Sequence, residues 1–213
     1  MEVVVSRLKR EYKKYKQPIV MRVKEISSDP YKILISTIIS LRTKDAVTEE
    51  ASLRLFELAS TPQEMIHLKQ SVIEKAIYPA GFYRNKSVSI LHVSKTILEK
   101  YNGRVPNTIE ELLSLKGVGR KTANLVLSLG YNIPAICVDT HVHRISNRLG
   151  AVNTKTPEKT EFALMKILKR KDWIIYNDLL VTWGQNVCKP INPQCVNCVL
   201  DDICKWGKEK NNH

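Results

Sequence analysis

Two glycines within a run of basic residues form the segment of this 213-residue chain best suited to hold an anion. The segment Leu115–Ala123 reads Leu-Lys-Gly-Val-Gly-Arg-Lys-Thr-Ala and joins two apolar stretches typical of helices. Gly117 and Gly119 flank Val118 and leave the backbone bare, so N–H groups at the start of the second helix can approach a phosphate closely. A nucleic-acid backbone fits such a site, whereas an ordinary tight turn is the alternative interpretation. The basic neighbours that favour the phosphate are Lys116, Arg120 and Lys121.

Lys121 and Asp139 are the two side chains near this segment that can take part in covalent and acid–base chemistry. A neutral lysine amine can act as a nucleophile and form a Schiff base, although a lysine beside a glycine turn is more often a plain phosphate contact. Asp139 fits the N-cap of a helix, and a carboxylate held there can also stabilise positive charge and assist proton transfer. His141 and His143 point to different helix faces, so we expect His141 to line the site and His143 to be structural.

Four cysteines near the C-terminus, Cys188, Cys195, Cys198 and Cys204, follow a C-x6-C-x2-C-x5-C pattern. In a reducing compartment this density indicates one metal centre rather than disulfides. Zinc is the general candidate for four thiolates, but a single C-x2-C pair fits the usual zinc-ribbon spacing less well, and the pattern also differs from that of ferredoxins. The fifth cysteine, Cys137, lies in an apolar stretch and is predicted to be a buried free thiol.

Helix signals recur along the chain, whereas alternating strand patterns with hairpin turns are missing. The sequence therefore predicts an all-α fold of about ten short helices. Capping glycines are expected just after helices, at Gly81, Gly103, Gly130 and Gly150. N-terminal helix signals are expected at Asp29-Pro30, Thr61–Glu64, Ser71–Glu74 and Thr108–Glu111.

The net charge of the chain is +13, from 34 Lys and Arg against 21 Asp and Glu. Such an excess favours a polyanionic partner, although a solvated surface or an RNA or ribosomal partner fits the charge equally well. The first residues do not resemble a secretion signal, and the most apolar stretch, Ile33–Leu41, is too short to span a membrane. We expect a soluble cytoplasmic protein that does not enter membranes.

The glycine hairpin, the Val-Asp-Thr-His segment that starts at Val138 and the four-cysteine pattern together resemble endonuclease III, of the helix-hairpin-helix DNA glycosylase superfamily. The resemblance runs from about Ile33 to Cys204. It implies a bifunctional DNA glycosylase/AP lyase of base excision repair, which removes oxidised pyrimidines and cleaves 3′ to the abasic site by β-elimination. It also implies that Lys121 is the nucleophile, that Asp139 is the catalytic carboxylate and that the four cysteines bind a 4Fe–4S cluster.

The resemblance further implies two lobes. A six-helix barrel would span residues 23–134 and contain the helix-hairpin-helix motif at about 108–130. Residues 1–22 and 135–213 would form a second helical lobe that carries the cluster. Lys121 and Asp139 would then face each other across a cleft that receives a flipped nucleotide. The partner would be double-stranded DNA with damaged pyrimidines or abasic sites, bound by a monomer associated with the nucleoid.

Four positions depart from the pattern of the family. Arg42 stands where the family commonly has a glutamine that fills the gap left by the flipped base, and its planar fork could pair with the orphaned base. Phe82 replaces a frequent leucine and could wedge into the base stack. Lys116 replaces a common proline, and Lys189 is the only basic residue between the first two cysteines. The predicted DNA-binding residues are Arg42, Phe82, Lys116, Gly117, Val118, Gly119, Arg120, His141 and Lys189.

Three alternatives remain open at this stage. A monofunctional mismatch glycosylase would share the hairpin, the aspartate and the cysteines but would lack the lysine and activate water instead. A non-catalytic DNA-binding module would use the hairpin for phosphate contact only, which leaves Lys121, Asp139 and the cysteines unexplained together. A zinc-stabilised RNA-binding protein is the third alternative.

Overall fold

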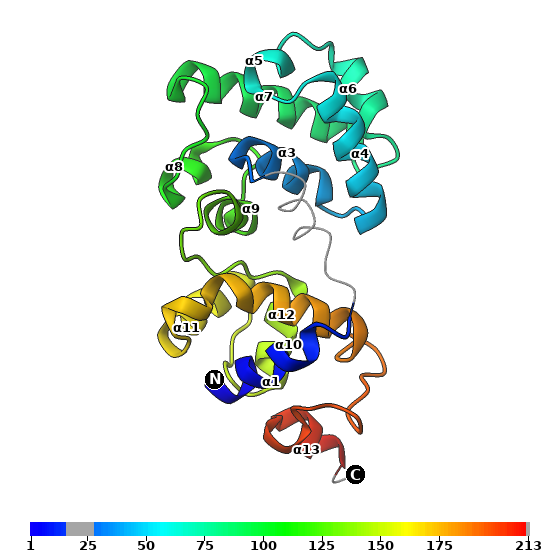
Figure 1. Cartoon of the computed structure of the whole chain (residues 1–213), viewed down its shortest axis with the longest axis vertical. Helices are drawn as coiled ribbons and strands as arrows, with labels where there is room; N and C mark the ends of the chain where they lie inside the picture. The colour runs from blue at the N-terminus through cyan, green and yellow to red at the C-terminus, as the bar shows by residue number, and fades with distance from the viewer. Residues whose placement is uncertain (16–27, 212–213) are drawn as a thin grey trace. The chain divides into compact units, whose positions relative to one another are not determined.

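All regular secondary structure in the described part of the chain, residues 1–15 and 28–211, is helical in this computed structural model (Figure 1). The expected all-α class is therefore confirmed. The chain divides into two units, one formed by Ile19–Ile133 and the other by Met1–Pro18 together with Pro134–His213. The lobe boundary predicted between residues 22 and 23 lies outside the described residues.

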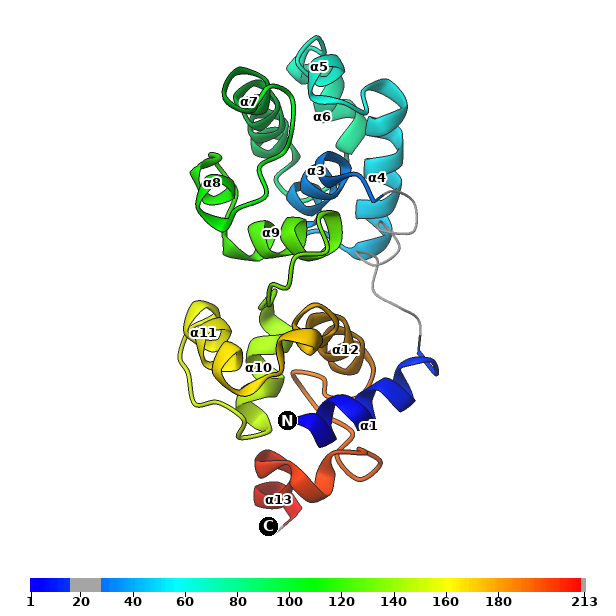
Figure 2. The same ribbon diagram turned by 60° about the vertical axis from the view of Figure 1, so that its left-hand side comes forward.

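The unit Ile19–Ile133 is built around one central helix, α3, most of whose residues are buried. Helix α3 packs against α4, α7, α9 and the π-helix η1, and Figure 2 shows these helices arranged around it. Further contacts join α4 to α6, α6 to α7, α5 to α7 and α8 to α9. The helices of this unit are α3 (Pro30–Ser40), α4 (Asp45–Leu58), α5 (Pro62–Met65), α6 (Gln70–Ile77), α7 (Tyr83–Tyr101), α8 (Ile109–Ser114), α9 (Arg120–Leu125) and η1 (Val126–Gly130).

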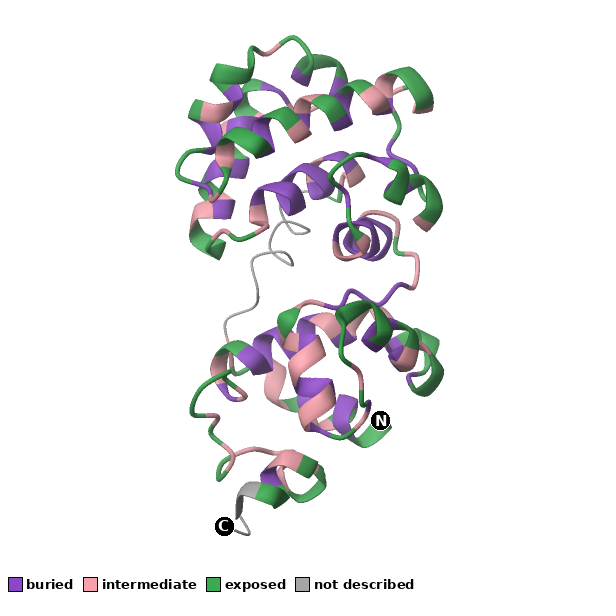
Figure 3. Ribbon diagram, turned by 180° about the vertical axis from the view of Figure 1, so that it is seen from behind, coloured by how far each residue is buried: buried purple, intermediate pink, exposed green. Residues whose placement is uncertain are grey.

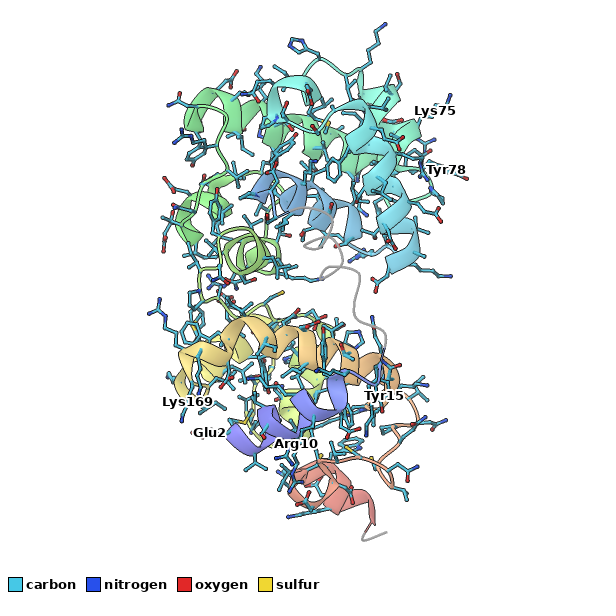
Figure 4. The ribbon with its side chains drawn as sticks, viewed as in Figure 1. Glu2, Arg10, Tyr15, Lys75, Tyr78 and Lys169 are labelled. Carbon is cyan, nitrogen blue, oxygen red and sulfur yellow. The ribbon has the colours of Figure 1, made fainter. Side chains whose placement is uncertain are left out.

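The second unit joins the N-terminal helix to the C-terminal third of the chain. Helix α1 packs against α12 and contributes Val4, Val5 and Leu8 to a core shared with α10 and α12. An ion pair of 2.6 Å between the Lys169 Nζ and the Glu2 carboxylate joins α1 to the segment after α11 (Figure 4). The helices are α1 (Glu2–Tyr12), α10 (Thr140–Arg148), α11 (Pro157–Ile167), the 3-10 helix η2 (Arg170–Asp172), α12 (Trp173–Asn186), the 3-10 helix η3 (Asp201–Ile203) and α13 (Lys205–Asn211).

Three of the four predicted helix starts are confirmed. The Asp29 side chain accepts a hydrogen bond from the Tyr31 N–H with Pro30 in the first turn, Thr61 forms a capping box with Glu64, and Thr108 caps α8. The prediction at Ser71 is wrong, because the N-cap of α6 is Lys69, two residues earlier, and the helix begins at Gln70. Short-range signals in the sequence permit a helix start after either Lys69 or Ser71 and do not choose between them.

Of the four glycines predicted to follow helices, two are confirmed and two have another role. Gly103 and Gly150 follow helices in the left-handed conformation, with φ of 78° and 76°, as expected. Gly130 is instead the last residue of η1, and a Cβ atom there would lie 3.0 Å from the Pro30 Cα. Gly81 lies beyond the C-cap of α6, which is Tyr78. Both of these glycines permit close approach between segments rather than serving as left-handed residues after a helix.

Figure 3 shows that burial follows the helix faces within each unit, with α3 and η1 almost entirely buried. Within the described residues, we find no helix with the length and apolar character that a membrane span requires.

Candidate functional site

The predicted hairpin is present between α8 and α9. Helix α8 ends at Ser114, and the Val118 N–H donates to the Leu115 carbonyl at 3.0 Å to close the turn. Gly117 adopts φ of 88°, a left-handed conformation that favours glycine. Val118 is buried and anchors the hairpin, while Lys116, Gly117 and Gly119 are exposed.

Gly119 is the N-cap of α9, and its conformation does not require glycine, because its φ is −96°. A Cβ atom at this position would meet nothing within 4 Å in the described structure. The packing of the protein therefore does not explain the missing side chain. A bare backbone at a helix start leaves room for an external anion to approach, which is the role that the sequence predicts.

Lys121 is the second residue of α9 and is half-buried, as is Arg120. From Thr122 to Leu129 every residue of α9 and η1 is buried. Only the first turn of this helix thus reaches the surface, and the two basic side chains stand at that end, directly behind the hairpin. The helix begins where the sequence predicts, and the amine lies at the edge of a rigid core.

Asp139 belongs to the other unit and is the N-cap of α10. Its Oδ1 atom accepts a hydrogen bond of 2.9 Å from the Val142 N–H, which fixes the orientation of the half-buried carboxylate. The segment before it is held by a hydrogen bond of 3.0 Å from the Asn177 side chain to the Cys137 carbonyl. The predicted capping role is confirmed, while the meeting of Asp139 with Lys121 across a cleft stays a prediction.

The two histidines of α10 have different surroundings. His143 Nδ1 lies 2.6 Å from the Thr160 hydroxyl and joins α10 to α11, as expected for a structural residue. His141 is half-buried, and its Nδ1 lies 3.2 Å from Arg144 Nη2. A Cβ atom on Gly184 of α12 would lie 2.3 Å from His141 Nδ1, so only glycine admits this approach. Gly184 was not among the predicted site residues, although an isolated glycine within a helical stretch is a signal of close packing.

The four predicted ligands, Cys188, Cys195, Cys198 and Cys204, line a single cavity. Arg148 of α10 closes one side of it, with Nη1 at 3.5 Å from the Cys188 Sγ and 2.7 Å from the carbonyl of the exposed Lys189. The Cys204 Sγ lies 3.5 Å from the Arg148 carbonyl. Cys137 lies elsewhere and is only 2% exposed, which confirms the prediction of a buried thiol.

The four thiols that line this cavity are potential ligands of a metal group. Among the described residues, no three His, Cys, Asp or Glu side chains converge closely enough to hold one metal ion. Tetrahedral zinc at about 2.3 Å from each sulfur would bring the sulfurs to about 3.8 Å from one another. A four-iron cluster binds one thiolate on each iron and holds the sulfurs further apart. Four thiols around one cavity are the donor set that either metal group uses.

Arg42 and Phe82, predicted to act at the base gap, lie next to each other in the unit Ile19–Ile133. The Arg42 guanidinium carbon is 5.4 Å from the centroid of the Phe82 ring. Both residues are exposed, and both adopt positive φ, 53° for Arg42 and 57° for Phe82. Residues 40 positions apart in the sequence thus form one surface pair, which no pattern in the sequence indicates.

Comparison with known proteins agrees with these features. Residues 35–170 match the HhH-GPD superfamily of base excision DNA repair proteins. Endonuclease III of Thermotoga maritima is 50% identical over 183 residues, which cover 86% of this chain and 86% of that protein. A solved non-covalent endonuclease III–DNA complex has a TM-score of 0.89 at 33% identity, covering 100% of this chain and 97% of that one.

A second solved structure is described as a trapped endonuclease III–DNA covalent intermediate with an estranged adenine. Its TM-score is 0.81 at 38% identity, and the match covers 86% of each chain. The match of the family over most of the sequence and the 50% identity to a curated relative confirm the resemblance. The chain belongs to the endonuclease III family, within the HhH-GPD superfamily of base excision DNA repair proteins.

Proposed function

We propose that this chain is a bifunctional DNA glycosylase/AP lyase, which excises oxidised pyrimidines through a Schiff base on Lys121 and cleaves the strand by β-elimination. The observation that carries the proposal is a lysine in the first turn of α9, directly behind a glycine hairpin, in a chain 50% identical to an endonuclease III. The solved covalent complex of a relative with DNA supports a covalent step, which a monofunctional enzyme does not need.

The reaction begins when the neutral Lys121 amine attacks C1′ of an extrahelical nucleotide. The C–N bond to the base breaks, and the base leaves with the electron pair and gains a proton. The sugar ring then opens at the C1′–O4′ bond to give an iminium between Lys121 and C1′. The iminium acidifies C2′, and loss of its proton expels the 3′ phosphate. Water finally hydrolyses the imine and releases the amine.

Asp139 supplies the negative charge that these reaction steps require. Its Oδ1 is oriented by the Val142 N–H, so the carboxylate does not have to reorganise as positive charge develops on the sugar. A carboxylate so held can also carry protons to and from the amine and the sugar oxygen. We propose this role for Asp139 beside Lys121.

Contacts with the DNA backbone and the opened stack hold the substrate. The hairpin backbone from Gly117 to Gly119, with Lys116 and Arg120, would bind a phosphate without regard to sequence. Arg42 would face the orphaned base, and Phe82 would wedge into the neighbouring step. His141 would lie near the flipped nucleotide, and Lys189 would contact a phosphate.

A 4Fe–4S cluster bound by Cys188, Cys195, Cys198 and Cys204 completes the proposal. The cavity that the four thiols share supports a metal group there, and their C-x6-C-x2-C-x5-C pattern fits a zinc ribbon less well. When bound, such a cluster would supply a covalent cross-link among four positions of a segment with little core of its own. Arg148 would hold the loop in place through the Lys189 and Pro190 carbonyls, at 2.7 and 2.8 Å.

We further propose that the protein acts as a monomer at the nucleoid.

The first prediction concerns the nucleophile. Lys121→Ala removes the amine, so borohydride should trap no adduct with abasic duplex DNA, and strand cleavage should fall roughly a thousandfold or more. Binding of the same duplex, measured by fluorescence anisotropy, should persist. Lys95→Ala on the exposed face of α7, where Lys95 pairs with Glu99, removes an equal charge and should trap like the unaltered protein. If the Lys121→Ala variant still forms an adduct, another amine reacts with the sugar. If the unaltered protein releases the base but forms no adduct, a monofunctional enzyme is favoured.

The second prediction separates the capping and catalytic roles of Asp139. Asparagine caps helices about as well as aspartate, so Asp139→Asn should change the free energy of unfolding by no more than about 0.5 kcal/mol. Single-turnover base excision should fall by about a hundredfold or more, because the charge is lost. Asp29→Asn, at the N-cap of α3, makes the same change at a purely structural cap and should leave excision unchanged. Equal excision rates for the two variants would leave Asp139 with the capping role alone.

The third prediction concerns the cysteines. Protein purified without oxygen should be brown, with broad visible absorbance and about four iron atoms per chain. Cys198→Ser should lose most of that absorbance, whereas Cys137→Ala, at the buried cysteine outside the cavity, should keep it. A colourless protein with one zinc ion, obtained from iron-supplemented anaerobic cultures, would refute the cluster.

A further inference from the structure

Lys86 of α7 is a buried lysine whose hydrogen-bond partners are all neutral. Lys86 is only 5% exposed. Its Nζ donates hydrogen bonds to the Ile39 and Leu41 carbonyls, each at 2.6 Å, and to the Thr43 hydroxyl at 2.7 Å. Burial lowers the pKa of its amine to about 8. An apolar side chain of similar length would avoid this desolvation, so the amine must contribute something specific.

The amine satisfies the carbonyl end of α3, which terminates at Ser40. The last carbonyls of a helix lack partners within the helix and carry partial negative charge, which a donor group offsets. Arg42 lies between Leu41 and Thr43, both of which bind Lys86. Lys86 thus binds the Leu41 backbone on one side of Arg42 and the Thr43 side chain on the other.

The same network reaches the turn that carries Phe82. The Gly81 N–H donates to the Thr43 hydroxyl at 3.1 Å, and the Lys86 backbone N–H donates to the Phe82 carbonyl at 3.0 Å. A Cβ atom on Gly81 would lie 2.4 Å from the Arg42 carbonyl oxygen, so the two loops are in direct contact. One lysine therefore holds both loops through its side chain and its backbone.

Two exposed residues in the left-handed conformation stand on these loops. Positive φ is unfavourable for arginine and phenylalanine, and it persists where the surroundings impose it. Phe82 is 60% exposed, and its ring lies 5.4 Å below the Arg42 guanidinium. The contact is made by two side chains that leave most of their surface open to a ligand.

We propose that Lys86 is a positioning residue, which locks the Arg42 loop and the Phe82 turn together so that the two side chains enter the opened duplex as one preformed pair. The inference rests on the proposed DNA glycosylase function. A pair already ordered before binding loses less conformational freedom when it fills the gap and the adjacent step. An abasic single strand has no orphaned base and no stack to open, so the pair contributes nothing to its processing.

The experiment compares two substrates. Lys86→Met should lower single-turnover excision from a duplex with one oxidised pyrimidine by tenfold to a hundredfold. Borohydride trapping of an abasic single strand should stay within twofold of the unaltered protein. Lys95→Met, the same substitution on the exposed face of α7, should change neither. Should Lys86→Met fail to fold, Thr43→Val removes the hydroxyl that links the two loops and should show the same contrast more weakly.

A double-mutant comparison tests whether Lys86 acts through the pair. In an Arg42→Ala, Phe82→Ala background, Lys86→Met should cause no further loss of duplex excision, because the groups that it positions are gone. Equal losses on both substrates, or a full additional loss in that background, would overturn the proposal and leave Lys86 with a role in stability alone. Failure of the unaltered protein to form a borohydride-trapped adduct with an abasic duplex would instead refute the proposed lyase function.

Discussion

The proposed site depends on one constraint: Lys121 must stand at the accessible start of a helix that is otherwise buried. The residues of α9 and η1 from Thr122 to Leu129 are buried in the core around α3, so the position of Lys121 at the start of α9 is fixed. The left-handed Gly117 turns the chain sharply enough to expose the first turn of α9. The same α3 meets Gly130 at its start and Lys86 at its end. One central helix thereby positions both Lys121 and the loop of Arg42.

Features that depend on neighbours in the sequence could be predicted from it. The hairpin, the helix start at Arg120 and the N-cap at Asp139 follow from short-range rules, because a glycine pair or a capping carboxylate acts within one helical turn. The all-α class followed from many such signals together. The shared cavity of the four cysteines agrees with their clustering within 17 residues of the sequence.

Features that depend on distant contacts could not be predicted. Gly130 looks like a C-cap in sequence, yet its bare backbone admits Pro30 from α3. Gly184 looks like a weak position in a helix, yet it admits His141. Lys86 looks like an ordinary surface lysine in a helix rich in polar residues, and only the fold brings it to the carbonyl end of α3. In each case the residue type reflects a partner that lies far away along the chain.

The central claim is that the amine at position 121 forms the bond to the sugar. The most direct measurement is peptide mapping of the borohydride-reduced complex with an abasic oligonucleotide, after digestion of both the protein and the DNA. We expect tandem mass spectrometry to find the reduced sugar remnant on the peptide that contains Lys121, attached at that residue. A remnant on another lysine or on the N-terminal amine would contradict the account.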